Sequence, residues 1–229
     1  MNRENIILFL VNREHNPELL QGIPNRDFEN LSVIYYEYLE EKHEVSLVTN
    51  TEMTEMELTE NELYNLAYEN TKRIFPLKVT SMPSVIRELG FDEYVEPENA
   101  TPMYVLGNEK GVLGASAILY PEVLKQVEEA LGENYMLLPS SKHEFIALAK
   151  DETTDLDNLQ SMVREINFTV VEPSDRLSDH VYEYDSVNGQ VKQVTFGPET
   201  SLYYGSLSLK IETDEDMEEV DEVPEQNPA

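Results

Sequence analysis

Residues 103–150, MYVLGNEKGVLGASAILYPEVLKQVEEALGENYMLLPSSKHEFIALAK, decide the fold class of this chain. They alternate short apolar runs with turn residues and contain one periodic segment between Pro121 and Gly132, which predicts a helix. The apolar face of that helix comprises Val123, Leu124, Val127 and Leu131. The apolar runs, each expected to form a strand, are residues 103–106, 115–120, 135–138 and 145–149. This stretch therefore predicts four strands and one helix that covers a face of their sheet.

The N-terminal half predicts two helices and a hairpin. Residues 4–21 are expected to form a helix, which Asn16-Pro17 could divide into two shorter ones. Residues 31–39 and 45–49 are rich in β-branched and aromatic side chains, which favours two strands joined by a polar connection. A capping box of Thr59 and Glu62 marks the start of a helix over residues 59–75. Residues 77–89 are ambiguous between a strand and a short helix.

The C-terminal part begins with a second periodic helix over residues 155–167. Its predicted core stripe comprises Leu159, Met162, Val163 and Ile166. Strands are expected at residues 168–171, 181–184 and 190–196, with a turn at 187–189, and residues 202–211 could add one more.

Together these segments predict an α+β fold, with a mixed or mostly antiparallel sheet covered by several helices. We expect a single domain over residues 1–211, which could consist of two lobes that meet near residues 90–102. Residues 212–229 are expected to be a disordered acidic tail that is dispensable for folding, because a run of like charges cannot offset the entropy of ordering.

The charge balance restricts the partners. Asp and Glu total 46 against 16 Lys and Arg, so the net charge is −30, and residues 212–225 contribute nine carboxylates. This balance argues against direct binding to nucleic acid or to an anionic membrane, since both require basic patches. The opening apolar run at residues 6–11 is far shorter than the about 20 residues that cross a bilayer, and it does not resemble a signal peptide. We therefore expect a cytoplasmic protein.

Several strings in the sequence resemble a bacterial family, the domain of unknown function 5688. They are DFENLSVIYYEYL (27–39), LTENELYNLAYENTKRIFP (58–76), MYVLGN (103–108) with GA (114–115), LYPEVLKQVEEALG (119–132), LPSSKHE (138–144) and SDHVYEYDSVNG (178–189). The resemblance covers about residues 5–189 and implies a shared fold in a bacterial or mobile-element setting, without implying a mechanism. Members commonly carry an additional N-terminal segment that this chain lacks, and the residues after Val194 extend beyond the pattern.

One string brings hydroxyls, an imidazole and a carboxylate together: Ser140, Ser141, His143 and Glu144. A hydrolase would need a hydroxyl, a base within hydrogen-bond reach and a third group that orients the base. In an extended segment Ser141 and His143 share a face, whereas Glu144 points away. The alternative is a turn in which the serines satisfy backbone groups, and the composition favours it.

The remaining candidates are weaker. Asp179 and His180, beside Ser178, could form a carboxylate-supported imidazole or cap the start of a strand. Four scattered histidines (positions 15, 43, 143 and 180) and the absence of cysteine predict no metal site and no disulfide. Gly107, Gly111 and Gly114 lack the spacing of a phosphate loop, so no cofactor is expected.

Three functions remain open. The first is a non-enzymatic protein-binding module whose acidic surface contacts a basic protein. The second is a mimic of nucleic acid that inhibits a host defence or restriction nuclease, and the third is a hydrolase that uses Ser141 and His143. The oligomeric state is not indicated.

Overall fold

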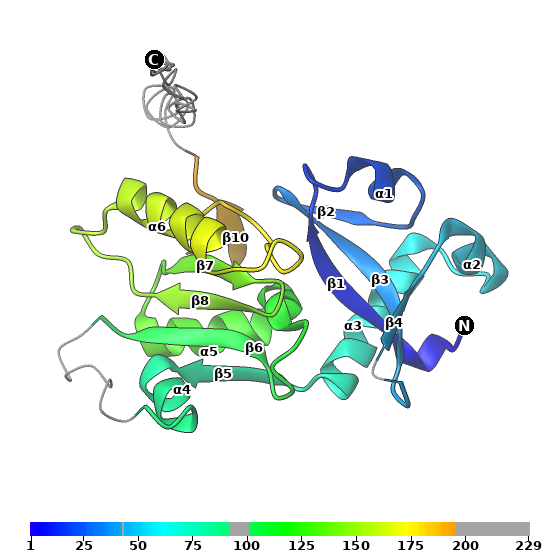
Figure 1. The fold of residues 1–229 in the computed structure, drawn as a ribbon, viewed down its shortest axis with the longest axis horizontal. Helices are drawn as coiled ribbons and strands as arrows, with labels where there is room; N and C mark the ends of the chain where they lie inside the picture. Colours follow the sequence, from blue (N-terminus) through cyan, green and yellow to red (C-terminus); the bar gives the residue numbers. More distant parts are fainter. Residues whose placement is uncertain (43, 92–100, 196–229) are drawn as a thin grey trace, which may run out of the picture. The chain divides into compact units, whose positions relative to one another are not determined.

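A computed structural model of the chain describes residues 1–42, 44–91 and 101–195. The chain divides into two units, Met1–Val194 and Thr195–Ala229, and every element named below belongs to the first unit. That unit contains two sheets, whose described strand pairs are all antiparallel, and several helices (Figure 1). The predicted α+β class is confirmed.

The N-terminal sheet is built on β1 and β3. Its strands are β1 (Ile6–Asn12), β2 (Arg26–Phe28), β3 (Leu31–Leu39) and β4 (Glu44–Leu47), in the order β1-β3-β2 with β4 also paired to β3. The predicted strands at residues 31–39 and 45–49 are therefore confirmed. The helix expected over residues 4–21 is correct only after the predicted division at Asn16-Pro17, where α1 (Pro17–Gln21) forms. Its first part is wrong, because the apolar run forms β1, which alternates between a face toward α3 (Ile6, Leu8, Leu10) and the opposite face (Ile7). Both faces of β1 carry apolar side chains, so it lacks the apolar and polar alternation that marks a strand.

Several helices pack near this sheet, and α3 is the longest of them. They are η1 (Arg3–Asn5), α1 (Pro17–Gln21), α2 (Asn50–Glu55) and α3 (Glu60–Ile74). The start of α3 is confirmed, because Thr59 accepts the Glu62 backbone N–H and the Glu62 carboxylate accepts the Thr59 N–H. Thr49 and Glu52 form a second capping box at α2, a helix that the sequence analysis did not predict.

The second sheet has six strands in the order β10-β9-β7-β8-β6-β5. They are β5 (Leu77–Ser81), β6 (Met103–Asn108), β7 (Met136–Ser141), β8 (Glu144–Leu148), β9 (Tyr182–Asp185) and β10 (Gln190–Gln193). The ambiguous residues 77–89 contain both alternatives, because β5 runs directly into α4 (Met82–Glu88). The predicted lobe boundary near residues 90–102 falls mostly outside the described part of the chain, and the strands on its two sides, β5 and β6, pair with each other.

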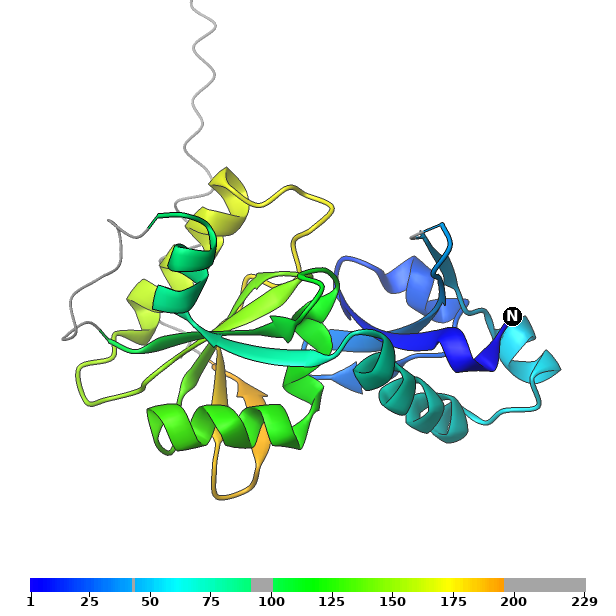
Figure 2. The same ribbon diagram turned by 90° about the horizontal axis from the view of Figure 1, so that it is seen from below.

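Helices cover both faces of this sheet. Figure 2 shows α5 (Pro121–Leu131) on one face and α4 and α6 (Leu156–Thr169) on the other. The strand β7 alternates accordingly, since Leu137 joins the core beneath α5 whereas Met136 and Leu138 pack with Val163 of α6. Helix α5 ends as predicted at Gly132, whose φ of 89° favours glycine.

One predicted strand is a helix instead. Residues 115–120 lie almost entirely in η3 (Gly114–Leu119), a buried 3-10 helix that contacts β1 as well as β6 and β8. A run of small and apolar residues that is buried on all sides carries no period, so strand and helix look alike in the sequence. A Cβ atom at Gly114 would lie 2.6 Å from the His143 carbonyl oxygen and 2.9 Å from Gly107 Cα, and this close approach requires glycine.

Helix α6 is turned away from its predicted orientation. Met162 and Ile166 are 38% and 40% exposed, whereas Gln160 and Asn167 are buried beside Val163. The strand expected at residues 168–171 is also wrong, because α6 continues to Thr169 and residues 170–171 are not in a strand.

The predicted strand at 202–211 and the predicted tail at 212–229 lie outside the described residues. Within the described part of the chain, no helix has the length and apolar character needed to span a bilayer.

Candidate functional site

Ser140, Ser141, His143 and Glu144 lie in and beside the turn between β7, which ends at Ser141, and β8, which begins at Glu144. The Ser141 hydroxyl accepts the His143 backbone N–H at 3.0 Å, and the Ser140 hydroxyl donates to Glu144 Oε1 at 3.3 Å. The register of the two strands shifts between Pro139 and Ser141, so the turn contains an irregularity. Ser141 therefore satisfies a backbone group, as the turn alternative expects, whereas Ser140 bonds to a side-chain carboxylate.

Both ring nitrogens of His143 face other groups. Leu113 donates its backbone N–H to His143 Nδ1 at 3.0 Å, and His143 Nε2 lies 3.5 Å from Asp175 Oδ2. Nδ1 is thus an acceptor, and Nε2 faces the Asp175 carboxylate, to which it can donate a hydrogen bond. The Ser141 hydroxyl contacts the backbone rather than the ring, so this geometry does not supply the serine and base pair that a hydrolase needs.

Asp175 is the residue that connects this turn to another part of the chain. Lys142 Nζ lies 2.6 Å from Asp175 Oδ1, and the Lys142 backbone N–H donates to the Asp175 carbonyl at 2.8 Å. The hydrogen bond from Lys142, together with the positive charge of Lys142 and the contact with His143, lowers the pKa of Asp175. No sequence pattern links positions 143 and 175, and the sequence analysis missed this contact.

Asp179 and His180 lie in a second polar cluster, around the segment that precedes β9. Asn167 of α6 donates to Asp179 Oδ1 at 2.7 Å, and Ser178 Oγ accepts the His180 backbone N–H at 3.1 Å. The carboxylate is thus oriented by an amide, and the serine closes a local turn before the strand. Burial lowers the pKa of the half-buried His180, so its imidazole is neutral at pH 7.

Ser178 is the centre of this cluster. Its hydroxyl oxygen lies 3.1 Å from Asn30 Nδ2 and 2.9 Å from the Tyr182 hydroxyl, and both of these side chains are buried. The Tyr182 hydroxyl also bonds to Asn30 Oδ1, and Asn167 donates to the Ser178 carbonyl at 2.9 Å. These bonds connect the β2–β3 turn, α6 and β9, which indicates a structural role for the cluster.

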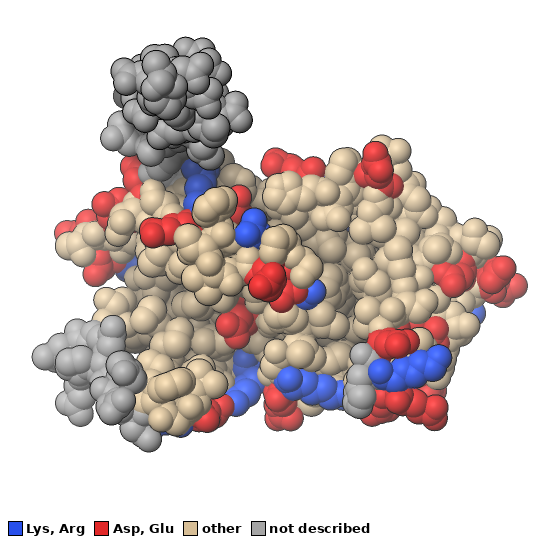
Figure 3. Space-filling view, viewed as in Figure 1, with Lys and Arg blue, Asp and Glu red and all other residues tan. Residues whose placement is uncertain are grey.

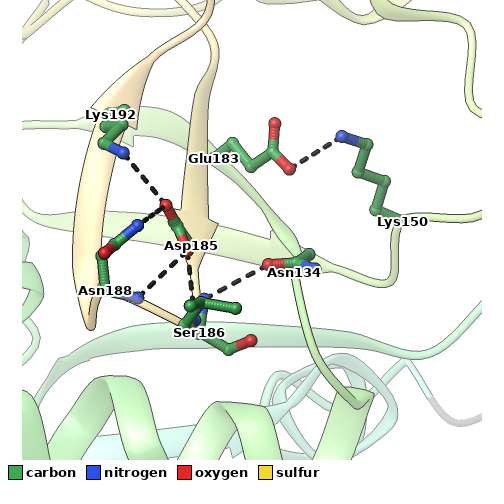
Figure 4. Close-up of polar contacts among 8 residues, drawn as sticks. Asn134, Lys150, Glu183, Asp185, Ser186, Asn188 and Lys192 are labelled. Atoms are coloured by element: carbon green, nitrogen blue, oxygen red, sulfur yellow. Dashed lines mark hydrogen bonds and ion pairs between the residues drawn. The ribbon is translucent and has the colours of Figure 1, made fainter.

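A third polar cluster lies in the β9–β10 hairpin. Asp185 accepts hydrogen bonds from the backbone N–H groups of Val187 and Asn188 and from the Asn188 side-chain amide (Figure 4). It also forms an ion pair with Lys192, whose Nζ lies 3.0 Å from Asp185 Oδ2. These hydrogen bonds lower the pKa of Asp185 to about 2, and the bond from the Asn188 side chain makes the largest contribution. The predicted turn at residues 187–189 is confirmed, and the carboxylate has its acceptor sites occupied by the turn itself.

Two neighbouring cavities lie beside the first two clusters. The larger, of about 550 Å³, is lined by Lys142 and by residues of β1, α1 and the 173–177 segment. The smaller, of about 290 Å³, includes Asp179 and Phe168, and both are lined by His15, Arg176 and Leu177. Among the residues that the structure describes, no group of three or more His, Cys, Asp or Glu side chains could hold a metal ion.

A family model described as "Family of unknown function (DUF5688)" matches residues 1–186 of the chain. Comparisons with curated proteins and with solved structures found no match.

Proposed function

The chain belongs to the family of unknown function DUF5688, and from this premise we propose that it is a non-enzymatic protein-binding module that acts through an acidic surface. Its partner is a protein with a basic surface, in a bacterial or phage-related cytoplasm. The observation that carries the proposal is the arrangement of carboxylates on α2 and at the start of α3.

These carboxylates form what we call the acidic edge, which comprises Glu52, Glu55, Glu57, Glu60 and Glu62. The sequence contains no Lys or Arg between Lys42 and Lys72, and all five carboxylates fall within that interval. Figure 3 shows acidic side chains over α2, where Figure 1 labels that helix. A local excess of one charge steers the approach of an oppositely charged protein.

Three of the five carboxylates are held in place by hydrogen bonds. Glu52 and Glu62 accept the backbone N–H groups of Thr49 and Thr59 in the two capping boxes, both at 2.8 Å. Glu60 accepts the Tyr35 hydroxyl at 2.5 Å, and Arg26 lies 2.7 Å from its second oxygen. Groups that are already ordered lose less entropy when a partner binds, so the acidic edge is prepared for a contact.

The charge of the edge persists at neutral pH. Hydrogen bonds from the backbone and hydroxyl of Thr59 lower the pKa of Glu62, so this carboxylate stays ionised well below pH 7. Arg26 offsets the charge of Glu60, and Arg3 donates to the Met56 carbonyl nearby, so the edge remains net negative. Glu55, Glu57 and Glu62 are exposed and could contact a basic surface directly.

The test is capture from a bacterial lysate at low and at high salt. We expect a basic protein to bind at low salt and to be released at high salt, because salt screens contacts between exposed charges. The captured protein is then titrated by biolayer interferometry against a Glu55→Gln, Glu62→Gln double variant. This variant keeps the capping geometry of position 62 and should bind about tenfold more weakly.

The matched control is a Glu129→Gln, Glu133→Gln variant, whose exposed carboxylates lie on and after α5. It loses the same net charge, so equal weakening by both variants would show that overall charge, and not the acidic edge, governs binding. Failure to capture any basic protein would refute the proposal. Displacement of a captured nuclease by DNA would instead favour the nucleic-acid mimic.

A further inference from the structure

The larger cavity has the opposite character to the rest of this acidic chain. Its basic residues are His15, Lys142 and Arg176, and no described Asp or Glu lines it. We call this cavity the basic groove. In a chain with 46 acidic residues, a lining without a carboxylate is a local reversal of charge that requires an explanation.

The floor of the groove is apolar. It is the face of the N-terminal sheet opposite α3, together with residues of α1 and of the turn before η3. The apolar lining residues are Phe9, Val11, Leu19, Tyr36, Val45 and Leu113. The rings of Phe9 and Tyr36 pack edge to face with centroids 5.3 Å apart, and Val45 is 40% exposed. The groove therefore offers apolar surface to a ligand.

The two strong cations at the rim are held by backbone carbonyls. Arg176 donates through Nε to the Val171 carbonyl at 3.0 Å and through Nη2 to the Phe168 carbonyl at 3.4 Å. None of the ion pairs between described residues includes Arg176. A guanidinium has five N–H donors, so donors remain for an incoming carboxylate.

Lys142 is partly neutralised but retains donor capacity. Its ammonium donates to the Ser174 carbonyl at 3.3 Å and pairs with Asp175 at 2.6 Å. An ammonium has three donors, and the third can be directed at a ligand. The His15 imidazole, which is exposed at the junction of the two cavities, supplies a further donor in either protonation state.

We propose that the basic groove binds an acidic segment of a partner protein, in which apolar side chains interleave with carboxylates. The apolar side chains pack on the floor between Phe9 and Val45, and the carboxylates bind Lys142 and Arg176. The volume of about 550 Å³ accommodates a few side chains of such a segment. This binding site is separate from the acidic edge and goes beyond the proposed function.

The probe is a short fluorescein-labelled peptide in which Leu and Glu alternate, added to the full chain. The net charge of −30 repels such a peptide at a distance, so the titration uses about 0.15 M salt, where the Debye length is about 8 Å. Fluorescence polarisation should show tighter binding than for the peptide with Gln in place of Glu. Equal binding of the two peptides would overturn the proposal.

Two matched pairs of variants locate the site. Lys142→Gln should weaken binding about tenfold, whereas Lys150→Gln should leave it unchanged, because Lys150 forms an equivalent ion pair with Glu183 at 2.7 Å outside the groove (Figure 4). Val45→Ser should weaken binding, and Val187→Ser, at an 86% exposed position on the β9–β10 turn, should not. Circular dichroism melts of each variant establish that the fold is intact.

Two outcomes would contradict the assignment. Equal weakening by Lys142→Gln and Lys150→Gln would show that the peptide responds to overall charge. The acidic segment could also come from the chain itself. A full-length variant with the nine carboxylates of residues 212–225 changed to amides tests this alternative. If the peptide binds only to that variant, the chain's own C-terminal residues occupy the groove and the external partner is refuted.

Discussion

Helices α5 and α6 pack on opposite faces of the same sheet, yet they present different side chains to it. The buried residues of α5 are Val123, Leu124 and Val127, whereas α6 buries Gln160 and Asn167 beside Val163. The exposed side of α6 contains Met162 and Ile166. The side chains that α5 buries against the sheet are all apolar. The orientation of α6 is instead set by polar groups that find partners in the segment before β9.

The largest expected effect tests the apolar side of this comparison. Leu124→Ala should lower the free energy of unfolding by about 2–4 kcal/mol, because it leaves a cavity beneath the sheet. Ile166→Ala on α6 should cost less than about 1 kcal/mol, since its side chain is 40% exposed. Urea unfolding of both variants measures the difference. Equal losses would mean that Ile166 faces the core.

The intermediate effect tests the polar side. Gln160 donates to the Asp179 carbonyl and accepts the Val181 N–H at 3.3 Å, so Gln160→Leu leaves both backbone groups without these partners. We expect a loss of about 1–3 kcal/mol in urea unfolding. The same substitution at Gln126, exposed on α5, is the control and should change stability by less than about 0.5 kcal/mol. A stabilised Gln160→Leu variant would show that α6 is held by apolar contacts after all.

The smallest expected effect concerns the hydrogen bonds of Asp185 at the end of β9, which are less buried than those of Gln160. The pKa of Asp185 is lowered from 3.8 to about 2, so its contribution to stability is present above about pH 4 and is lost as the pH falls toward 2. The wild type should therefore melt at a higher temperature than Asp185→Asn at pH 6, and the gap should close between pH 4 and pH 2. Thermal melts monitored by circular dichroism measure it. A gap that is independent of pH would show that the charge of Asp185 does not stabilise the turn.

Local sequence signals predicted two helix boundaries, although the equivalent capping box of Thr49 and Glu52 at α2 was missed. The capping box at Thr59 and the glycine at position 132 fixed helix ends in α3 and α5, because both act within one turn of the chain. Residues 6–12 and 114–119 were mispredicted because they are buried on more than one side. Their apolar runs have no period that could separate strand from helix.

The candidate clusters were less predictable than the elements. The turn around Ser141 was foreseen, since hydroxyls satisfy nearby backbone groups. The partners of His143 were not, because Leu113 and Asp175 are distant in sequence and are brought together only by packing. The burial of Gln160 and Asn167 in α6 could not be predicted, because polar residues in an amphipathic helix normally indicate the exposed face.

The cluster around Ser178 also constrains the order of events during synthesis. Asn30, in the N-terminal sheet, bonds to a residue 148 positions later in the chain. At about 5–20 residues per second, the ribosome supplies that partner about 7–30 s after Asn30. During this interval the Asn30 amide has neither Ser178 nor Tyr182, so the β2–β3 turn gains these hydrogen bonds only after residue 182 has been synthesised. Until β9 has been synthesised, the nascent N-terminal sheet therefore lacks the polar partners of Asn30, although the residues that form β1, β3 and α3 are already present.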